Sequence, residues 1–457
     1  MPCCRKPNIV LFGIDSLSAR NMSCYGYPRQ TTPHMDRFAS QGIRFAEAHT
    51  NPPCCPSRTA LLLAKRPSTT KVFTNNDNWC MLSPNTVSMP EHLRKHGYEM
   101  IRIGKIFHGG GGKLFEKESS WDRVIEESDG LPPPQRTPRP GTGPGVEYAK
   151  KAREAAKQGK DAEGGTAFIY GPTGLDDEED PDGRIATQAI KVLNQKQEKP
   201  LFLAVGFHRT HLPFRAPDKY FAMYPPAQMV IPKNPNSGPD GMPADPQAKL
   251  SKQNPYTPEQ WREAISAHFA CLSFVDAQVG RVLDALEKSG RADKTIVVIW
   301  SDHGFMLGEH FLWRKGPLRD ESTMSVLMMR APGVTQPGSV CKRPVECVDI
   351  FPTLLDLCGI SLPEDIEAVS MKPLLENPSR PWKKGALMHG GKGGQSIVTE
   401  RWRYNEFKGA PDKTELFDQD KDPGEFTNLA HDPQHADVVA DLHRLLAGGW
   451  RACLPAG

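Results

Sequence analysis

Residues 7–14, PNIVLFGI, form an unbroken apolar run that ends at Asp15. Such a run is typical of a strand that is buried on both faces of a parallel sheet. Comparable runs recur at residues 201–206 (LFLAVG) and 295–300 (TIVVIW). These three runs predict buried strands far apart in the sequence.

Helix-like stretches separate these runs, and the longest has apolar residues at helical spacing. Strands that alternate with helices predict an α/β fold with a mainly parallel sheet that is flanked by helices on both faces. The helix-like stretches are residues 34–41, 89–96, 184–194 and 258–288.

Two other stretches, residues 109–182 and 223–255, are rich in Gly and Pro, and the first is also rich in charge. This composition is typical of loops. We therefore expect long surface excursions there rather than core.

The last part of the chain has a different pattern. Short β-like pieces at residues 396–407 and 414–420 precede a helix-like stretch at 436–446. We expect a catalytic α/β domain at residues 1–365. A smaller C-terminal α+β subdomain, with an antiparallel sheet and a helix, is expected at 366–457.

Composition argues against several classes of protein. The chain has 57 Lys and Arg against 54 Asp and Glu, a formal net charge of +3, which gives no electrostatic footprint for nucleic acid. No apolar run reaches the ~20 residues of a membrane span, and the start has no signal-peptide core. The chain as written is expected to be cytoplasmic, or periplasmic or secreted if a leader was trimmed. Its 11 cysteines match neither a disulfide scaffold nor paired CxxC zinc motifs.

Ionisable residues follow two of the predicted strands: Asp15 directly follows the first, and Asp302 and His303 come after the third, separated from it by one residue. Ligands of open parallel sheets gather beyond the carboxyl ends of strands, so these residues could meet at one cation. Taken alone, each Asp is equally well read as a helix cap or a turn residue.

The segment CCPSR at residues 54–58 precedes an apolar helical run. Pro56 suits the first turn of a helix, so Cys54 would lie near the positive end of a helix dipole, where an anion is welcome. The simpler interpretation is a buried cysteine before a helix.

Together these features resemble the formylglycine-dependent (type I) sulfatase family, whose C/S-x-P-S-R motif is oxidised at its first residue. The resemblance extends over nearly the whole chain, and the implied fold is alkaline-phosphatase-like. It includes, among other pieces, PNIVLFGIDSLSARNMSCYGY, CCPSRTALLLAKRP, GYEMIRIGKIFHGG, FLAVGFHRTHLPF, SDHGFMLGEHFLWRK and ELFDQDKDPGEFTNLA.

The resemblance implies a hydrolase of sulfate esters, and it implies roles for individual residues. Cys54 would become the formylglycine nucleophile through a formylglycine-generating enzyme, and Arg58 would hold it. Asp15, Cys54, Asp302 and His303 would bind a divalent metal, Ca²⁺ by resemblance, with Mg²⁺ or Mn²⁺ as alternatives. The groups that would contact the nucleophile, grip the sulfate or assist the leaving oxygen are Lys105, His108, His211 and Lys315.

The pieces HRTHLPFRAP, GKIFHGG and GEHFLWRK are most similar to the iduronate-2-sulfatase branch. That likeness implies a sulfated carbohydrate, most simply a sulfated uronic acid at the end of a glycan. Asn75 and Trp79 would contact the sugar, and Arg209 or Arg215 would pair with its carboxylate. The alternative is a polar turn beside a core tryptophan.

Two rival functions fit the same fold. One is hydrolysis of phosphonate monoesters or phosphodiesters, which a strand-end Asp and an Asp-His pair also suit. The other is a non-catalytic, sulfatase-like binding protein. The chain departs from the family pattern at Ser16, where many relatives have a second Asp, and at residues 63–65, where a Thr-Gly-Arg-like stretch is usual.

Overall fold

A computed structural model describes residues 6–110, 113–146, 150, 168–235 and 257–455. Within these residues the centre is an eight-stranded sheet in the order β15-β2-β14-β11-β1-β9-β4-β7. Its middle strands run parallel, whereas β14 is antiparallel to both of its neighbours. The strands are β1 (Asn8–Asp15), β2 (Ile43–Phe45), β4 (Glu99–Gly104), β7 (Arg123–Ile125), β9 (Leu201–Thr210), β11 (Thr295–Ser301), β14 (Leu327–Arg330) and β15 (Ser339–Cys341). The predicted mainly parallel sheet is confirmed.

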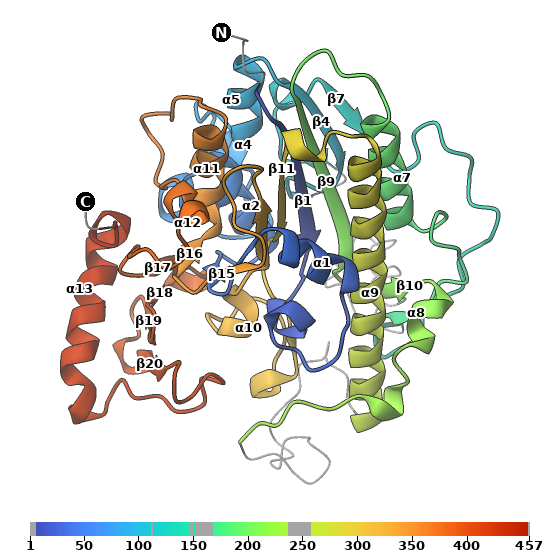
Figure 1. Ribbon diagram of the computed structural model, residues 1–457. Coiled ribbons are helices and arrows are strands. Elements are labelled where there is room, and N and C mark those ends of the chain that lie inside the picture. Colours follow the sequence, from blue (N-terminus) through green and yellow to red (C-terminus); the bar gives the residue numbers. More distant parts are fainter. Residues whose placement is uncertain (1–5, 111–112, 147–149, 151–167, 236–256, 456–457) are drawn as a thin grey trace.

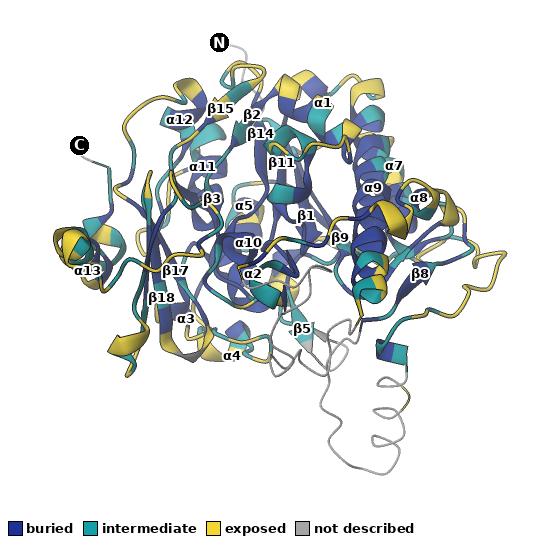
Figure 2. Cartoon of the chain, turned by 90° about the horizontal axis from the view of Figure 1, so that it is seen from below, coloured by how far each residue is buried: buried dark blue, intermediate teal, exposed yellow. Residues whose placement is uncertain are grey.

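β1 shows why the sheet is covered on both faces. Its side chains alternate between two hydrophobic clusters, with Val10 and Phe12 in one and Ile9 and Leu11 in the other. Figure 1 shows helices on each side of the strands, and Figure 2 shows the strands buried between them. The main helices of the first cluster are α1 (Pro33–Gln41), α7 (Pro181–Leu193) and α9 (Pro258–Lys288), and those of the second are α2 (Cys54–Leu63), α5 (Met89–Lys95), α11 (Ile350–Leu357) and α12 (Lys372–Glu376).

Part of the stretch that was expected to form surface loops joins the main sheet or the core. Residues 123–125 form the exposed edge strand β7, whereas Phe168 and Tyr170 are buried. The expectation was therefore wrong for Phe168 and Tyr170 and, as regards a loop, for β7, because Gly- and Pro-rich composition hides such short pieces. Residues 111–112, 147–149, 151–167 and 236–255 of the two expected loops lie outside the described residues.

The C-terminal part forms a second, antiparallel sheet in the order β17-β18-β19-β20, beside the long helix α13 (Figure 1). These elements are β17 (Ala386–His389), β18 (Gly394–Val398), β19 (Trp402–Phe407), β20 (Glu415–Asp418) and α13 (Ala436–Ala452). Buried Arg403 of β19 joins this sheet to the main domain, because its Nη2 lies 2.8 Å from Asp320 Oδ1. Asp320 opens the short helix α10 (Asp320–Thr323).

The described helices include none that is long and apolar enough to cross a bilayer. The long helix α9 instead packs its apolar side chains into the first hydrophobic cluster.

Candidate active site

Strand register brings the two strand-end aspartates together. Ile14 of β1 pairs with Ser301 of β11, so Asp15 and Asp302 leave adjacent strands at the same level. The backbone N–H of Ser16 donates to Asp302 Oδ1 at 2.9 Å, which links the two strand ends directly. Both aspartates are fully buried.

Cys54, the first residue of α2, meets these aspartates. Its Sγ lies 3.2 Å from His303 Nε2 and 3.8 Å from Asp15 Oδ1. One ligand atom from each of Asp15, Cys54, Asp302 and His303 lies within 4.8 Å of the others. His303 Nδ1 lies 2.8 Å from the Gly304 carbonyl, which leaves Nε2 as the nitrogen that faces the cluster.

The basic side chains around this cluster stabilise anionic groups within it. Burial raises the pKa of the Asp15 carboxyl, but Lys105, His211 and Arg58 hold it well below its usual range. Burial and Asp15 also raise the pKa of the Cys54 thiol, yet Lys315, His303 and Lys105 bring it well below the ordinary value. The centre therefore favours negative charge at position 54.

Arg58 lies one turn along α2 from Cys54, and its guanidinium is fully buried. Nε donates to Asp302 Oδ2 at 2.7 Å, and Nη1 donates to the carbonyl oxygens of Lys105 and Ile106. Nη2 has no hydrogen-bond partner in the described part of the chain and lies 3.8 Å from Asp15 Oδ2. A buried donor without a partner, directed at the cluster, fits an additional oxygen acceptor there.

Lys105 follows β4, and close packing of two glycines positions it. A Cβ on Gly206 of β9 would lie 2.0 Å from the Lys105 carbonyl oxygen, and one on Gly104 would lie 2.2 Å from the Gly206 carbonyl. Lys105 Nζ forms an ion pair with Asp15. Only residues without a side chain allow the two strand ends to approach this closely.

His108, His211 and Lys315 complete the predicted set. Burial and nearby Lys105 lower the pKa of His108 to about 4, so its ring is neutral at pH 7. His211 Nδ1 lies 2.7 Å from the Leu212 carbonyl, which leaves Nε2 as the ring nitrogen available to other partners. Lys315 is close enough to lower the pKa of both Asp15 and Cys54. The structure thus gathers the predicted catalytic and metal residues at the carboxyl end of the sheet.

Two adjoining cavities open at Lys105. One, of about 290 Å³, is lined by Asp15, His211 and Arg209, among others; the other, of about 470 Å³, is lined by His108 and Arg102, among others. His208, which the sequence did not single out, lines both. Its position three residues before His211, at the end of the same strand, was the signal that could have identified it.

The four residues predicted to contact the sugar lie in different surroundings. Asn75 accepts the N–H of Cys55 through Oδ1 at 3.0 Å, so it borders the start of α2. Arg209 lines the smaller cavity, but its Nη2 lies 3.8 Å from Asp180. Trp79 is fully buried and donates to the Phe115 carbonyl, so the prediction that it contacts the sugar was wrong. Arg215 is absent from the lining of both cavities.

Comparisons with known proteins match one family over most of the chain. The sulfatase family model matches residues 7–360, and a model described as N-sulphoglucosamine sulphohydrolase, C-terminal, matches residues 308–449. A sulfatase from Formosa agariphila is 30% identical, covering 96% of this chain and 86% of its own. Iduronate 2-sulfatase from Homo sapiens is also 30% identical, over 78% of this chain and 70% of its own.

Among solved structures, phosphonate monoester hydrolase from Silicibacter pomeroyi superposes with a TM-score of 0.76 at 22% identity. The match covers 98% of this chain and 96% of that one. At this identity the likeness concerns the fold alone, and one fold can carry different reactions.

Proposed function

The chain belongs to the sulfatase family and is a sulfuric ester hydrolase, and from this premise we propose that it removes sulfate from a sulfated carbohydrate. The observation that carries the proposal is the convergence of Asp15, Cys54, Asp302 and His303 beside the unpartnered Nη2 of Arg58. The proposed sugar is a sulfated uronic acid at the end of a glycan. The 30% identity to human iduronate 2-sulfatase supports the uronic acid, whereas the match to the N-sulphoglucosamine sulphohydrolase C-terminal model supports a sulfated sugar more generally.

We propose that Cys54 is oxidised to formylglycine. The surroundings of Cys54 fit that residue, because Arg58 Nη2 has no acceptor in the described chain and nearby cations favour negative charge at this position. When formed, the hydrated aldehyde supplies one hydroxyl to attack sulfur and a second whose ionisation releases the bound sulfate. The modifying enzyme would have to recognise the chain despite the Leu-Ala-Lys at residues 63–65.

The proposed metal ligands are Asp15, Asp302, His303 and the converted residue 54. Their donor set is mainly oxygen, and it fits Ca²⁺, with Mg²⁺ or Mn²⁺ as alternatives. The Ser16 hydroxyl, which donates to Asp15 Oδ1 at 3.0 Å, stands where many relatives have a second aspartate. A bound divalent ion would stabilise negative charge on the nucleophile and on sulfate oxygens.

The remaining residues have roles that follow from charge and position. Lys105 and Lys315 are proposed to grip the sulfate, since fixed ammonium groups stabilise the charge that shifts as the S–O bond breaks. His211 is proposed to hold the sulfate and to give a proton to the leaving sugar oxygen through Nε2. His108 stays neutral and can donate or accept a hydrogen bond beside Lys105.

Asn75 and Arg209 are proposed to contact the sugar itself. The side chain of Asn75 uses its carbonyl for the N–H of Cys55, so its amide NH₂ is available for a sugar hydroxyl. Arg209 would attract a uronate carboxylate, although its ion pair with Asp180 already offsets part of its positive charge.

The test is a substrate panel of sulfated mono- and oligosaccharides, 4-nitrophenyl sulfate and a phenyl phosphonate monoester. We expect turnover of at least one sulfated uronic acid with a kcat/KM well above that for the aryl sulfate. Activity on the aryl sulfate with none on any sulfated sugar would refute the carbohydrate proposal. A preference for the phosphonate would favour the rival chemistry.

A further inference from the structure

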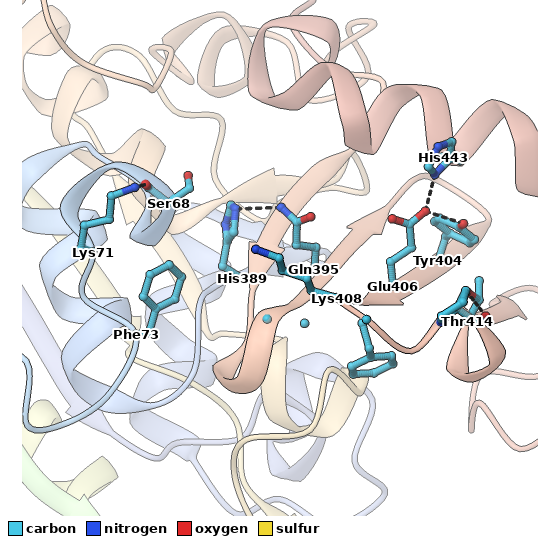
Figure 3. Close-up of a pocket in the computed structure, with 15 residues that line it drawn as sticks. Ser68, Lys71, Phe73, His389, Gln395, Tyr404, Glu406, Lys408, Thr414 and His443 are labelled. Atoms are coloured by element: carbon cyan, nitrogen blue, oxygen red, sulfur yellow. Dashed lines mark hydrogen bonds and ion pairs between the residues drawn. The ribbon is translucent and has the colours of Figure 1, made fainter.

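A third cavity lies between the segment that follows α3 (Pro67–Thr70) and the C-terminal sheet (Figure 3). Its volume is about 690 Å³, within the range in which small-molecule sites fall. Lys71 and Phe73 form one wall. On the other wall, His389 ends β17, Gln395 lies in β18 and Lys408 follows β19 (Figure 3).

Hydrogen bonds and packing tie the walls of this cavity to the catalytic centre. The N–H of His389 donates to Asn51 Oδ1 at 2.8 Å, three residues before Cys54. The Phe73 segment also contains Asn75, whose Oδ1 accepts the N–H of Cys55. Gly394 packs against Leu318, three residues after Lys315, since a Cβ on this glycine would lie 3.0 Å from the leucine side chain. These contacts connect the cavity walls directly to the chain segments that carry Cys54 and Lys315.

The cavity carries positive charge that is not neutralised within the protein. Lys71 and Lys408 have no carboxylate partner among the described residues, and both are exposed. Glu406 is the one carboxylate in the described lining, so the two lysines outnumber it, and its Oε1 already contacts His443 and the Tyr404 hydroxyl, the latter at 2.6 Å. A negatively charged ligand is therefore favoured over a neutral or cationic one.

The other lining groups suit a sugar ring. Phe73 and Phe407 supply apolar faces against which sugar C–H groups can pack, and Gln395 supplies a neutral amide. Gln395 Nε2 lies 3.3 Å from His389 Nε2, so the amide is held at the cavity wall. Aromatic rings, an amide and lysines without a carboxylate partner together match an anionic saccharide better than a simple inorganic anion.

We propose that this cavity binds a second, negatively charged sugar unit of the substrate, next to the unit whose sulfate is cleaved. The inference rests on the proposed function, and it adds that the enzyme prefers an oligosaccharide to a monosaccharide. Lys71 and Lys408 contact the sulfate or carboxylate of that second unit, and Phe73 and Gln395 contact its ring.

Charge reversal tests the inference. The double variant Lys71→Glu/Lys408→Glu is compared with Lys384→Glu, which changes an exposed lysine of the C-terminal part outside the cavity. The probes are a heparin-derived sulfated tetrasaccharide, the matching sulfated monosaccharide and 4-nitrophenyl sulfate, and tetrasaccharide affinity is also measured by calorimetry. We expect the ratio of tetrasaccharide to monosaccharide kcat/KM to fall by about tenfold or more in the double variant, with weaker binding, because two attractive contacts become repulsive.

The possible outcomes distinguish a failure of the inference from a failure of the proposed function. If the wild type cleaves both sugars and the ratio is the same in the wild type and the double variant, the inference fails and the proposed function stands. If the wild type cleaves the aryl sulfate but neither sugar, the proposed function and the inference fail together. A fall of the ratio in Lys384→Glu as large as in the double variant would also overturn the inference, since general surface charge would then explain it.

Discussion

The proposed role of Lys315, gripping the sulfate, depends on the positive charge of its ammonium group. It is half-buried, and its ammonium group helps to lower the pKa of Cys54 and of Asp15. We predict that Lys315→Ala lowers kcat/KM for 4-nitrophenyl sulfate by a factor on the order of 10² to 10³, the usual loss for a preorganised stabilising donor. Steady-state kinetics, with Lys384→Ala as the matched control, provide the check. A change below about threefold would place Lys315 outside the reaction.

The candidate metal ligands predict a dependence on divalent ions. Asp15, Asp302 and His303 are fully buried, and each places a ligand atom within 4.8 Å of the others, as a bound divalent ion requires. We predict that prolonged chelation abolishes turnover and that Ca²⁺ restores it. Elemental analysis of the active protein should show about one divalent ion per chain, as expected for a single ligand cluster. Full activity in metal-free protein would contradict the assignment.

At the residue scale, the sequence predicted some members of the site and missed others. Asp15 and Asp302 could be placed together because each follows a buried strand of a parallel sheet. Lys105, His211 and Lys315 could be assigned only by family resemblance, since lone basic residues are usually solvated. Trp79 was misplaced because a tryptophan among polar residues reads equally well as a surface platform or as a core ring. His208 was missed because its proximity to Lys105 depends on how two strand ends pack.

At the scale of elements, the approach of β4 to β9 determines where Lys105 lies. We predict that Gly206→Ala lowers kcat/KM on the order of 10²-fold, because the new methyl group would push the Lys105 backbone away from its position. Gly391→Ala is the control, since a Cβ there meets nothing within 4 Å. Both variants are compared by aryl sulfate kinetics and by thermal melting. Equal activity in the two folded variants would show that the close approach does not position Lys105.

Long buried elements were predictable, and short ones were not. The three apolar runs became β1, β9 and β11, because burial on both faces leaves an unmistakable run of apolar residues. The long helix expected at residues 258–288 has those bounds in the structure. The edge strand β7 was missed, since three residues within a Gly- and Pro-rich stretch carry no periodic signal.

At the scale of the whole molecule, buried ion pairs attach the C-terminal sheet to the main domain. Arg403 is fully buried and pairs with Asp320 of the main domain and with Glu425. We predict that Arg403→Met destabilises the protein by about 3 to 5 kcal/mol, because buried Glu425 loses its ion pair and Asp320 is left with its ion pair to Arg20. Arg444→Met, which removes an exposed ion pair with Asp441, should cost less than about 1 kcal/mol.

Urea unfolding of both variants measures the difference. If Arg403→Met unfolds at the same urea concentration as Arg444→Met, the buried pairs do not hold the two parts together.

The central claim is that this chain is a sulfatase whose nucleophile is made from Cys54. It is tested most directly by the mass of the Cys54 peptide from active enzyme, co-expressed with a formylglycine-generating enzyme, together with the aryl sulfate turnover of Cys54→Ala. We predict a peptide that has lost sulfur and two hydrogens and gained one oxygen, and no turnover by the variant. Full turnover by protein in which Cys54 is an unmodified thiol would contradict the account.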